Sequence, residues 1–225
     1  MTSFVGRRDD LARIVALLGT GRLVTVLGPG GAGKTRLALE AARGHRPEYP
    51  GGAWMIYLAP VTEPVEVGPA VLAGIGVRGG AMFEAGARVE GDGLDALVDR
   101  LGDRDALLLV DNCEHLVDAV AHLVTALLAR CAGLRVLATS REPLAVDGEA
   151  LVPLGPLPLH EPGADVAQAR RTASVRLFLE RAAAVRPGFD LDEANLADVT
   201  RLVRGLDGLP LALENYNLLH RLWRQ

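Results

Sequence analysis

Short apolar runs alternate along most of the chain with stretches in which apolar residues recur every three to four positions. The runs predict buried strands and the spaced stretches predict amphipathic helices, a pattern typical of a parallel sheet with helices on both faces. The predicted strands are residues 22–28, 53–59, 106–111, 134–140 and 150–154. The predicted helices between them are residues 35–44, 68–75, 93–102 and 115–130. We therefore expect an α/β fold built on a five-stranded parallel sheet.

A cluster of prolines ends this alternation. Its members are Pro153, Pro156, Pro158 and Pro162. Because proline interrupts regular structure, we place a domain boundary near residue 158. Further helical patterns follow at residues 170–185, 194–205 and 210 to the end. The prediction is a first domain over residues 1–158 and the start of a small helical lid domain over residues 159–225.

Residues 77–93 interrupt the pattern in a different way. The stretch is rich in glycine and shows no apolar period, so it predicts a mobile loop. No internal repeat is visible anywhere in the sequence.

Composition narrows the class of protein. The 225 residues are 49% hydrophobic and 23% charged, which is ordinary for a globular chain, and the net charge is -4. An acidic balance argues against a broad phosphate-binding surface, so we expect no direct nucleic-acid contact from this chain. Cys113 and Cys131 form no metal or disulfide spacing, which favours buried thiols in a reducing cytosol. No apolar run reaches bilayer length, so we expect a cytoplasmic protein without a membrane segment.

The only lysine of the chain, Lys34, lies in the stretch GPGGAGKT at residues 28–35. This matches G-x-x-x-x-G-K-[ST] and lies between a predicted strand and a predicted helix, as a phosphate-binding loop requires. Glycines let backbone N–H groups turn around a phosphate, and the helix N-terminus adds partial positive charge. Lysine is a compact charge that reaches between the β- and γ-phosphates, where a planar guanidinium fits less well. The alternative is a glycine-rich turn with a solvated lysine.

This loop supplies most of the predicted nucleotide-binding residues. They are Gly28, Pro29, Gly30, Gly31, Ala32, Gly33, Lys34, Thr35 and Arg36. The hydroxyl of Thr35 is expected to bind Mg²⁺. We also expect Lys34 to be solvated when no nucleotide is bound.

The strand ALLLVD ends in Asp111, which has the place of a Walker B carboxylate that holds hydrated Mg²⁺. The alternative is an aspartate that caps the next helix. Asn112 follows, where many ATPases have a second acid that orients water, and an amide cannot accept a proton. Glu114 is the nearest substitute, although it can equally be a helix-start acid. We interpret Cys113 and His115 as residues that pack locally or that support the site residues without binding the ligand.

The strand at residues 134–140 ends in Thr139 and Ser140, followed by Arg141. If this strand lies between the phosphate-loop strand and the Asp111 strand, its polar end faces the γ-phosphate. Arg141 could then report whether that phosphate is present. The alternative is a solvated charge at the end of a strand.

Four segments in this order resemble the signal-transduction ATPases with numerous domains, and in particular the NB-ARC-like module of bacterial antibiotic-regulatory-type transcriptional regulators. They are FVGRRDDL (4–11), LLLVDNCEHL (107–116), LATSREPL (137–144) and GLPLALE (208–214). The resemblance covers almost the whole chain. It implies a P-loop NTPase core in which LATSREPL is the first sensor and its strand is inserted beside the phosphate-loop strand.

The resemblance also implies further nucleotide contacts. Val5, Gly6 and Arg7 would line the nucleotide near its base and sugar, and Pro210 would pack on the adenine from the lid. A plainer interpretation of Pro210 is a proline that starts a helix. Two features depart from the family pattern: Arg8 replaces the usual acid, and the tail NYNLLHRLWRQ replaces an Ala- and Arg-rich helix. We expect this tail to mark a truncated lid.

The function implied is a regulatory switch that holds ADP in a closed form and ATP in an open form, with slow Mg²⁺-dependent ATP hydrolysis. Lys34, Asp111, Glu114 and Arg141 would carry the chemistry, with Thr35 and Asp111 on the metal. The expected partners are the adenine nucleotide, other domains of a larger regulator (a DNA-binding effector and sensor repeats), and other copies in a nucleotide-dependent association. Two alternatives are a P-loop kinase or motor ATPase, and a non-hydrolysing, nucleotide-dependent interaction module.

Overall fold

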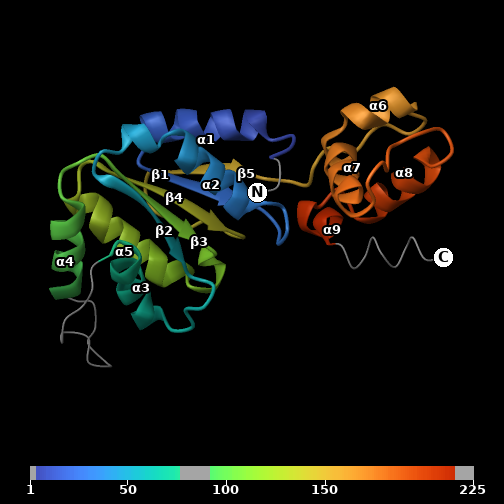
Figure 1. The fold of residues 1–225 in the computed structure, drawn as a ribbon. Coiled ribbons are helices and arrows are strands. Elements are labelled where there is room, and N and C mark those ends of the chain that lie inside the picture. Colours follow the sequence, from blue (N-terminus) through green and yellow to red (C-terminus); the bar gives the residue numbers. More distant parts are fainter. Residues whose placement is uncertain (1–3, 77–91, 216–225) are drawn as a thin grey trace. The chain divides into compact units, whose positions relative to one another are not determined.

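A computed structural model of the chain describes residues 4–76 and 92–215, and the structure confirms the expected α/β fold (Figure 1). The strands are β1 (Leu23–Leu27), β2 (Gly52–Tyr57), β3 (Ala106–Asp111), β4 (Leu134–Ser140) and β5 (Glu149–Pro153). They form one parallel sheet in the order β2-β3-β4-β1-β5. The sheet therefore places β4 between the phosphate-loop strand β1 and the Asp111 strand β3.

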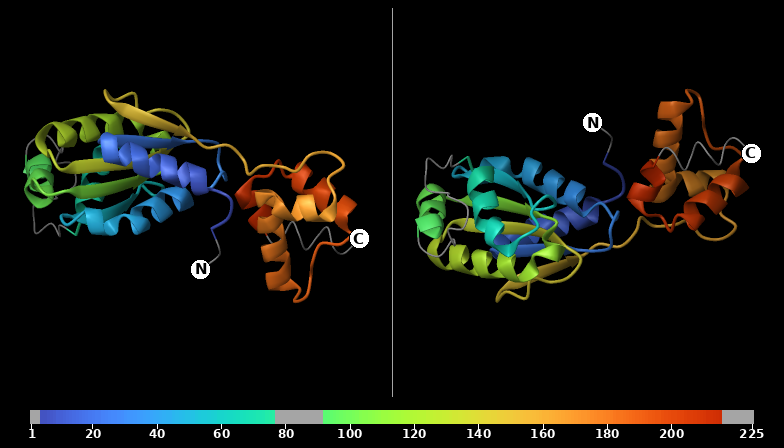
Figure 2. Two further views of the ribbon diagram at one scale, coloured as in Figure 1. Left: turned by 90° about the horizontal axis from the view of Figure 1, so that it is seen from above. Right: turned by 90° about the horizontal axis from the view of Figure 1, so that it is seen from below.

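Helices cover both faces of this sheet. They are α1 (Arg8–Thr20), α2 (Lys34–Gly44), α3 (Val67–Gly74), α4 (Asp92–Leu101) and α5 (Val117–Arg130), with short 3₁₀ turns η1 (Arg46–Glu48), η2 (Pro64–Glu66) and η3 (Cys113–His115). Figure 1 shows α1 and α2 on one face and α3, α4 and α5 on the other, and Figure 2 shows these two layers from above and below.

The apolar pattern did not predict α1, because the segment was identified only by its motif. The helix carries Asp9 and Asp10 in its first turn, where the helix dipole favours acids. Its buried residues Ile14 and Leu18 are four positions apart and so lie on one face. The helix α4 begins at Asp92, one residue before the predicted helix at 93–102 and inside the predicted loop; residues 77–91 of that loop lie outside the described residues.

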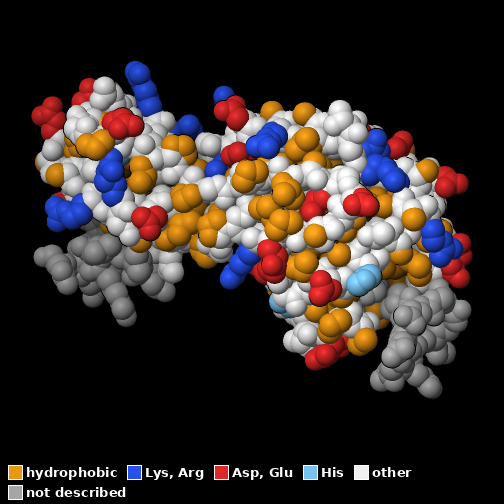
Figure 3. All heavy atoms as spheres, turned by 180° about the vertical axis from the view of Figure 1, so that it is seen from behind, with side chains coloured by type: hydrophobic (Ala, Val, Ile, Leu, Met, Phe, Trp, Pro, Cys, Tyr) orange, Lys and Arg blue, Asp and Glu red, His pale blue; other side chains and the backbone are white. Residues whose placement is uncertain are grey.

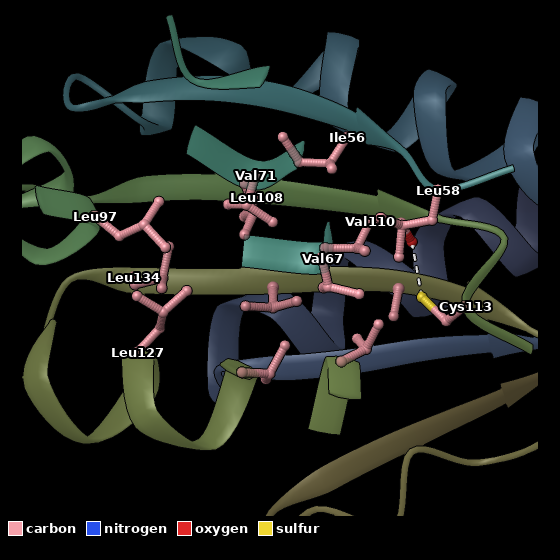
Figure 4. Close-up of a cluster of buried hydrophobic side chains, with 14 of the residues drawn as sticks. Ile56, Leu58, Val67, Val71, Leu97, Leu108, Val110, Cys113, Leu127 and Leu134 are labelled. Carbon is pink, nitrogen blue, oxygen red and sulfur yellow. Dashed lines mark hydrogen bonds between the residues drawn. The ribbon is translucent and has the colours of Figure 1, made fainter. Parts of the chain in front are cut away.

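The main apolar core lies between the sheet and the layer of α3, α4 and α5. Figure 4 shows side chains from β2, β3, β4, α3 and α5 meeting there, among them Ile56, Val71, Leu108 and Leu127. Every residue of β3 is buried. Burying side chains of this size contributes on the order of 1.5 to 3 kcal/mol each. The core thereby fixes β3 in the sheet and, with it, the position of Asp111 at the strand's carboxyl end.

A second set of helices follows β5. These are α6 (Val166–Arg171), α7 (Ala173–Val185), α8 (Leu196–Gly205) and α9 (Pro210–Glu214). They have a core of their own around Phe178, Val175, Val203 and Leu213. Asp165 starts α6 with a capping box, since it accepts from the Gln168 amide while Gln168 accepts from the Asp165 amide. The predicted tail beyond residue 215 lies outside the described residues.

The chain divides into two compact units. One contains residues 9–28 and 34–153, which include the whole sheet. The other contains, within the described residues, 4–8, 29–33 and 154–215. The tip of the phosphate loop thus groups with the second set of helices. None of the helices in residues 4–76 and 92–215 combines the length and the apolar character that a membrane span requires.

Candidate functional site

The predicted phosphate loop directly follows β1, and α2 begins at Lys34. Gly31 and Gly33 have left-handed backbone angles, with φ of 80° and 92°, which residues with a side chain rarely adopt. The Ala32 amide donates to the Pro29 carbonyl at 3.3 Å and closes a tight turn at the tip. Glycines are therefore present where the backbone requires them, and the loop ends on the N-terminus of an eleven-residue helix.

Lys34 corrects one expectation. We expected a solvated side chain, but Lys34 is only 9% exposed, and its Nζ donates to the Gly28 carbonyl at 2.9 Å. A buried ammonium needs hydrogen-bond acceptors, and the carbonyl at the start of the loop supplies one. The Lys34 side chain is therefore held by the backbone of the loop itself.

Asp111 is a buried carboxylate with two hydroxyl donors at the carboxyl end of the sheet. It is 3% exposed, and its Oδ1 accepts hydrogen bonds from Thr35 Oγ1 at 2.6 Å and from Thr139 Oγ1 at 2.7 Å. Such short O–H···O⁻ contacts are of the charge-assisted kind. The structure thus brings together the two residues predicted to bind Mg²⁺, Thr35 and Asp111. A hydroxyl and a carboxylate are oxygen ligands of the type that Mg²⁺ takes, so the pair fits that ion.

Thr139 links this carboxylate to the next residue of the chain. Asn112 has a left-handed backbone with φ of 67°, and its amide donates to Thr139 Oγ1 at 3.0 Å. Since the hydroxyl oxygen accepts from Asn112, its single proton is free to go to Asp111. Residue patterns identified Thr139 only as part of a polar strand end. Its position beside Asp111 depends on β4 being the neighbour of β3, which the order of the strands supplies.

Glu114 and Arg141 form an ion pair, with Arg141 Nε 3.0 Å from Glu114 Oε1. The arginine side chain is 64% exposed and the glutamate side chain 15%. The other carboxylate oxygen, Glu114 Oε2, is buried and has no hydrogen-bond partner among the described residues. The two residues to which the sequence assigned separate tasks are therefore in contact, and the glutamate retains an unused acceptor.

Cys113 and His115 pack locally, as expected. Burial and the nearby carboxylates of Asp111 and Glu114 raise the pKa of the Cys113 thiol to about 12, and its Sγ donates to the Val110 carbonyl (Figure 4). His115 Nε2 lies 2.8 Å from the Val61 carbonyl, and its Nδ1 lies 3.2 Å from the side-chain nitrogen Nδ2 of Asn112. A carbonyl partner requires the proton on Nε2, so His115 joins η3 to the segment after β2.

The N-terminal motif residues lie in the other unit. Val5 is buried in the core of the second set of helices. Gly6 has φ of 73°, and a Cβ there would come within 2.2 Å of Ala173 Cβ, so only glycine fits. Arg7 is 9% exposed, and its Nη2 donates to the Ala32 carbonyl at 3.3 Å and to the Gly155 carbonyl at 2.6 Å.

Pro210 and the residue after it lie against the tip of the phosphate loop, within the same unit. Pro210 starts α9, as the plainer interpretation predicts, and a Cβ built on Gly33 would lie 3.8 Å from its Cγ. The Leu211 amide donates to the Gly31 carbonyl at 3.1 Å. Pro210 and Leu211 thus lie beside the tip of the phosphate loop, at Gly33 and Gly31.

On the face drawn in Figure 3, basic and acidic side chains are interspersed over the described residues, without a broad basic area. Within residues 4–76 and 92–215, no group of three or more His, Cys, Asp or Glu side chains is arranged as a metal centre.

Comparison with known sequences places these features in a family. A family model described as Novel STAND NTPase 1 matches residues 1–224. A protein of Mycobacterium tuberculosis named as an HTH-type transcriptional regulator is 39% identical over 199 residues, which cover 88% of this chain and 20% of that protein. An uncharacterized protein of the same organism is 36% identical over 214 residues, or 95% of this chain and 50% of that protein. The chain spans half or less of the length of these relatives.

Solved structures agree on the fold. A Signal Transduction ATPase with Numerous Domains (STAND) protein with a tetratricopeptide repeat sensor from Pyrococcus horikoshii matches 100% of this chain and 33% of its own, with a TM-score of 0.54 at 18% identity. A Walker-type ATPase of Pyrococcus abyssi matches 98% of this chain and 70% of its own, with a TM-score of 0.57 at 15% identity. The structure of Drosophila ORC bound to DNA matches 95% of this chain and 54% of its own, with a TM-score of 0.62 at 17% identity.

Proposed function

This chain belongs to the novel STAND NTPase 1 family, and from that premise we propose that it is the adenine-nucleotide-binding switch module of a larger transcriptional regulator, with slow Mg²⁺-dependent ATP hydrolysis. The observation that carries the proposal is the hydrogen bond from Thr35, the last residue of the G-x-x-x-x-G-K-T loop, to Asp111 at the end of β3. A loop, a lysine, a hydroxyl and a strand-end carboxylate in this arrangement are the parts that P-loop NTPases use.

The phosphate loop would bind the diphosphate of ADP or ATP. Backbone amides of the loop and the N-terminus of α2 supply donors and partial positive charge. Lys34 would turn from the Gly28 carbonyl, 2.9 Å away, to the β- and γ-phosphate oxygens. The two contacts are alternatives for one ammonium, so we expect nucleotide binding to release that carbonyl.

Thr35 and Asp111 would hold Mg²⁺, and Thr139 would keep the carboxylate in position. A bound Mg²⁺ supplies charge neutralisation for the terminal phosphates. The hydrogen bond from Thr35 Oγ1 to Asp111 Oδ1 already brings the two oxygens to 2.6 Å. Metal binding would then need little rearrangement of these side chains, because both come from ordered elements.

Arg141 would distinguish ATP from ADP, and Glu114 would orient the attacking water. Arg141 follows β4, the strand between β1 and β3, and most of its side chain is exposed. In this proposal the γ-phosphate takes Arg141 from Glu114, because a phosphate carries more charge than a carboxylate. The exchange frees both oxygens of Glu114 at the moment when a water beside the γ-phosphate needs an acceptor.

A switch requires that the two nucleotides bind two conformations with different affinities. The γ-phosphate contacts of Lys34, Mg²⁺ and Arg141 are the source of that difference in this proposal. The relatives named as HTH-type transcriptional regulators are several times longer than the match to this chain. We therefore place the DNA-binding effector and the sensor in other parts of such a protein. We also propose that the module responds to nucleotide exchange by associating with other copies of itself.

Steady-state phosphate release from ATP tests the proposal against its two rivals. We expect turnover far below about 1 s⁻¹, the lower end of ordinary enzymes. A faster rate would favour a kinase or motor ATPase. Tight ATP binding with no phosphate release would instead favour a non-hydrolysing interaction module.

Glu114→Gln sharpens the same assay. The amide keeps the size of the side chain but accepts no proton, so turnover should fall while ATP stays bound. Asp118→Asn is a matched control, because Asp118 is an acid in the first turn of α5. An unchanged rate in Glu114→Gln would leave Glu114 as a helix-start acid.

A further inference from the structure

Two carbonyls at the tip of the phosphate loop have partners elsewhere in the same unit. The Gly31 carbonyl accepts from the Leu211 amide at 3.1 Å, and the Ala32 carbonyl accepts from Arg7 Nη2 at 3.3 Å. Both donors are far from the loop in sequence. The outer side of the loop tip is therefore held by side-chain and main-chain donors rather than left to solvent.

Holding a carbonyl also orients the amide of the same peptide. In a trans peptide the C=O and the next N–H point in opposite directions within one plane, and the described residues contain no cis peptide. A contact from Arg7 to the Ala32 oxygen therefore directs the Gly33 N–H away from the guanidinium. Glycine permits many backbone conformations, and Gly33 has φ of 92°, so a contact to the Ala32 oxygen restricts the orientation of the peptide that carries its amide.

The Arg7 side chain is held in this position by burial and by a second main-chain contact. It is only 9% exposed, and the same Nη2 donates to the Gly155 carbonyl at 2.6 Å. Gly155 lies in the segment between β5 and the second set of helices. A guanidinium is planar and carries several donors, so one side chain can join two main-chain segments.

We infer that Arg7 is a positioning residue for phosphate binding: it holds the Ala32–Gly33 peptide so that the Gly33 amide is presented to the β-phosphate. This deepens the proposed nucleotide function and rests on it. It differs from the role implied by the family resemblance, in which Arg7 lies near the base and sugar. The two roles predict different ligand dependence, because the positioning role concerns only the phosphates.

Calorimetric titration of the full chain with inorganic pyrophosphate, ADP and GDP separates the two roles. In Arg7→Met, affinity for pyrophosphate and for ADP should each fall about tenfold, the value of one charge-assisted hydrogen bond. The ratio of ADP to GDP affinity should stay at its wild-type value. Arg204→Met is a matched control, since Arg204 also donates to a main-chain carbonyl, that of His160, in the same unit; its affinities should be unchanged.

Other results overturn the inference. Unchanged pyrophosphate affinity in Arg7→Met, together with weaker ADP binding or a shifted ADP to GDP ratio, would make Arg7 a base or sugar contact. Unchanged affinity for every ligand would make it a structural residue only. If Arg7→Met does not fold, Arg7→Lys retains a donor for one carbonyl, and the same comparison applies with a smaller loss. A wild-type chain that binds neither pyrophosphate nor ADP would overturn the proposed function itself.

Discussion

Two carboxylates three positions apart, Asp111 and Glu114, are held in opposite ways. Asp111 is almost fully buried, and one of its oxygens accepts from two hydroxyls at 2.6 and 2.7 Å. Glu114 has one partner, the largely exposed Arg141, and one oxygen without any partner among the described residues. The first arrangement fixes a carboxylate. The second leaves a carboxylate that can exchange its contact.

The difference follows from where each residue lies. Asp111 ends a strand that is buried along its whole length, and both neighbours, Thr35 and Thr139, come from elements packed on that strand. Glu114 lies in the short turn η3, and its partner follows the end of β4. An ion pair with one exposed member contributes about 1 kcal/mol or less, so a ligand can replace it. We therefore propose that the fixed carboxylate binds the metal and that the exchangeable pair senses the nucleotide.

Among the changes that test this comparison, the largest effect is expected at Asp111. In Asp111→Asn, affinity for Mg²⁺-ATP should fall by about a hundredfold or more, since changes even to groups that only support a metal ligand cost about 10- to 100-fold. Affinity for ATP in the presence of a chelator should change much less. Calorimetry with and without Mg²⁺ measures both. Equal losses in the two conditions would mean that Asp111 supports the site generally and does not bind the metal.

Arg141→Ala should weaken ATP binding by roughly tenfold to a hundredfold and leave ADP binding nearly untouched. A charge-assisted contact with the γ-phosphate is worth about 1.5 to 3 kcal/mol, and each 1.4 kcal/mol is a factor of ten. Both affinities are measured at fixed Mg²⁺. Equal losses for ATP and ADP would remove the sensing role, and no loss for either would make Arg141 a solvated charge.

Thr139→Val should reduce the Mg²⁺-dependent part of ATP affinity about tenfold, because Asp111 loses one of its two hydroxyl donors. Thr139→Ser keeps the hydroxyl and should retain affinity close to that of the wild type. These two variants test whether the hydroxyl of Thr139 holds Asp111 in place, and they leave the predicted metal ligands Thr35 and Asp111 unchanged. If serine fails to rescue, the methyl group of Thr139 matters and the hydrogen bond does not.

The smallest effect is expected at the ion pair of Glu114 with Arg141. In Glu114→Gln, Arg141 no longer has a charged partner, so ATP affinity should rise, by about two- to fivefold at most, with ADP affinity unchanged. The same titration in Glu114→Gln combined with Arg141→Ala should show no rise. A gain that persists in the double variant would contradict competition between Glu114 and the γ-phosphate.

Much of the fold could be predicted from the sequence, because buried parallel strands appear as short apolar runs. All five strands lie within two residues of the predicted ranges. The position of β4 between β1 and β3 came from the family resemblance, since apolar periodicity carries no information on strand order. The helix α1 was not predicted: it overlaps the FVGRRDDL motif at residues 4–11, and only Ile14 and Leu18 of its residues are buried.

The site was less predictable where it depends on contacts between distant residues. The G-x-x-x-x-G-K-[ST] loop and the strand-end Asp111 are local patterns, so the sequence predicts both as site residues without knowledge of distant contacts. The ion pair of Glu114 with Arg141 requires η3 and the end of β4 to meet, which no local pattern encodes. The same holds for Arg7, whose carbonyl partners are 25 and 148 residues away in the sequence. The expectation that Lys34 is solvated was wrong, because the glycine-rich loop offers a carbonyl of its own to the buried ammonium.

The central claim is that the loop around Lys34 binds the phosphates of an adenine nucleotide. The most direct test is calorimetric titration of Mg²⁺-ADP and Mg²⁺-ATP into the wild-type chain and into Lys34→Ala, with circular dichroism to show that the variant is folded. We predict saturable binding of both nucleotides by the wild type and no measurable binding by the folded variant. Unchanged affinity in folded Lys34→Ala would contradict it.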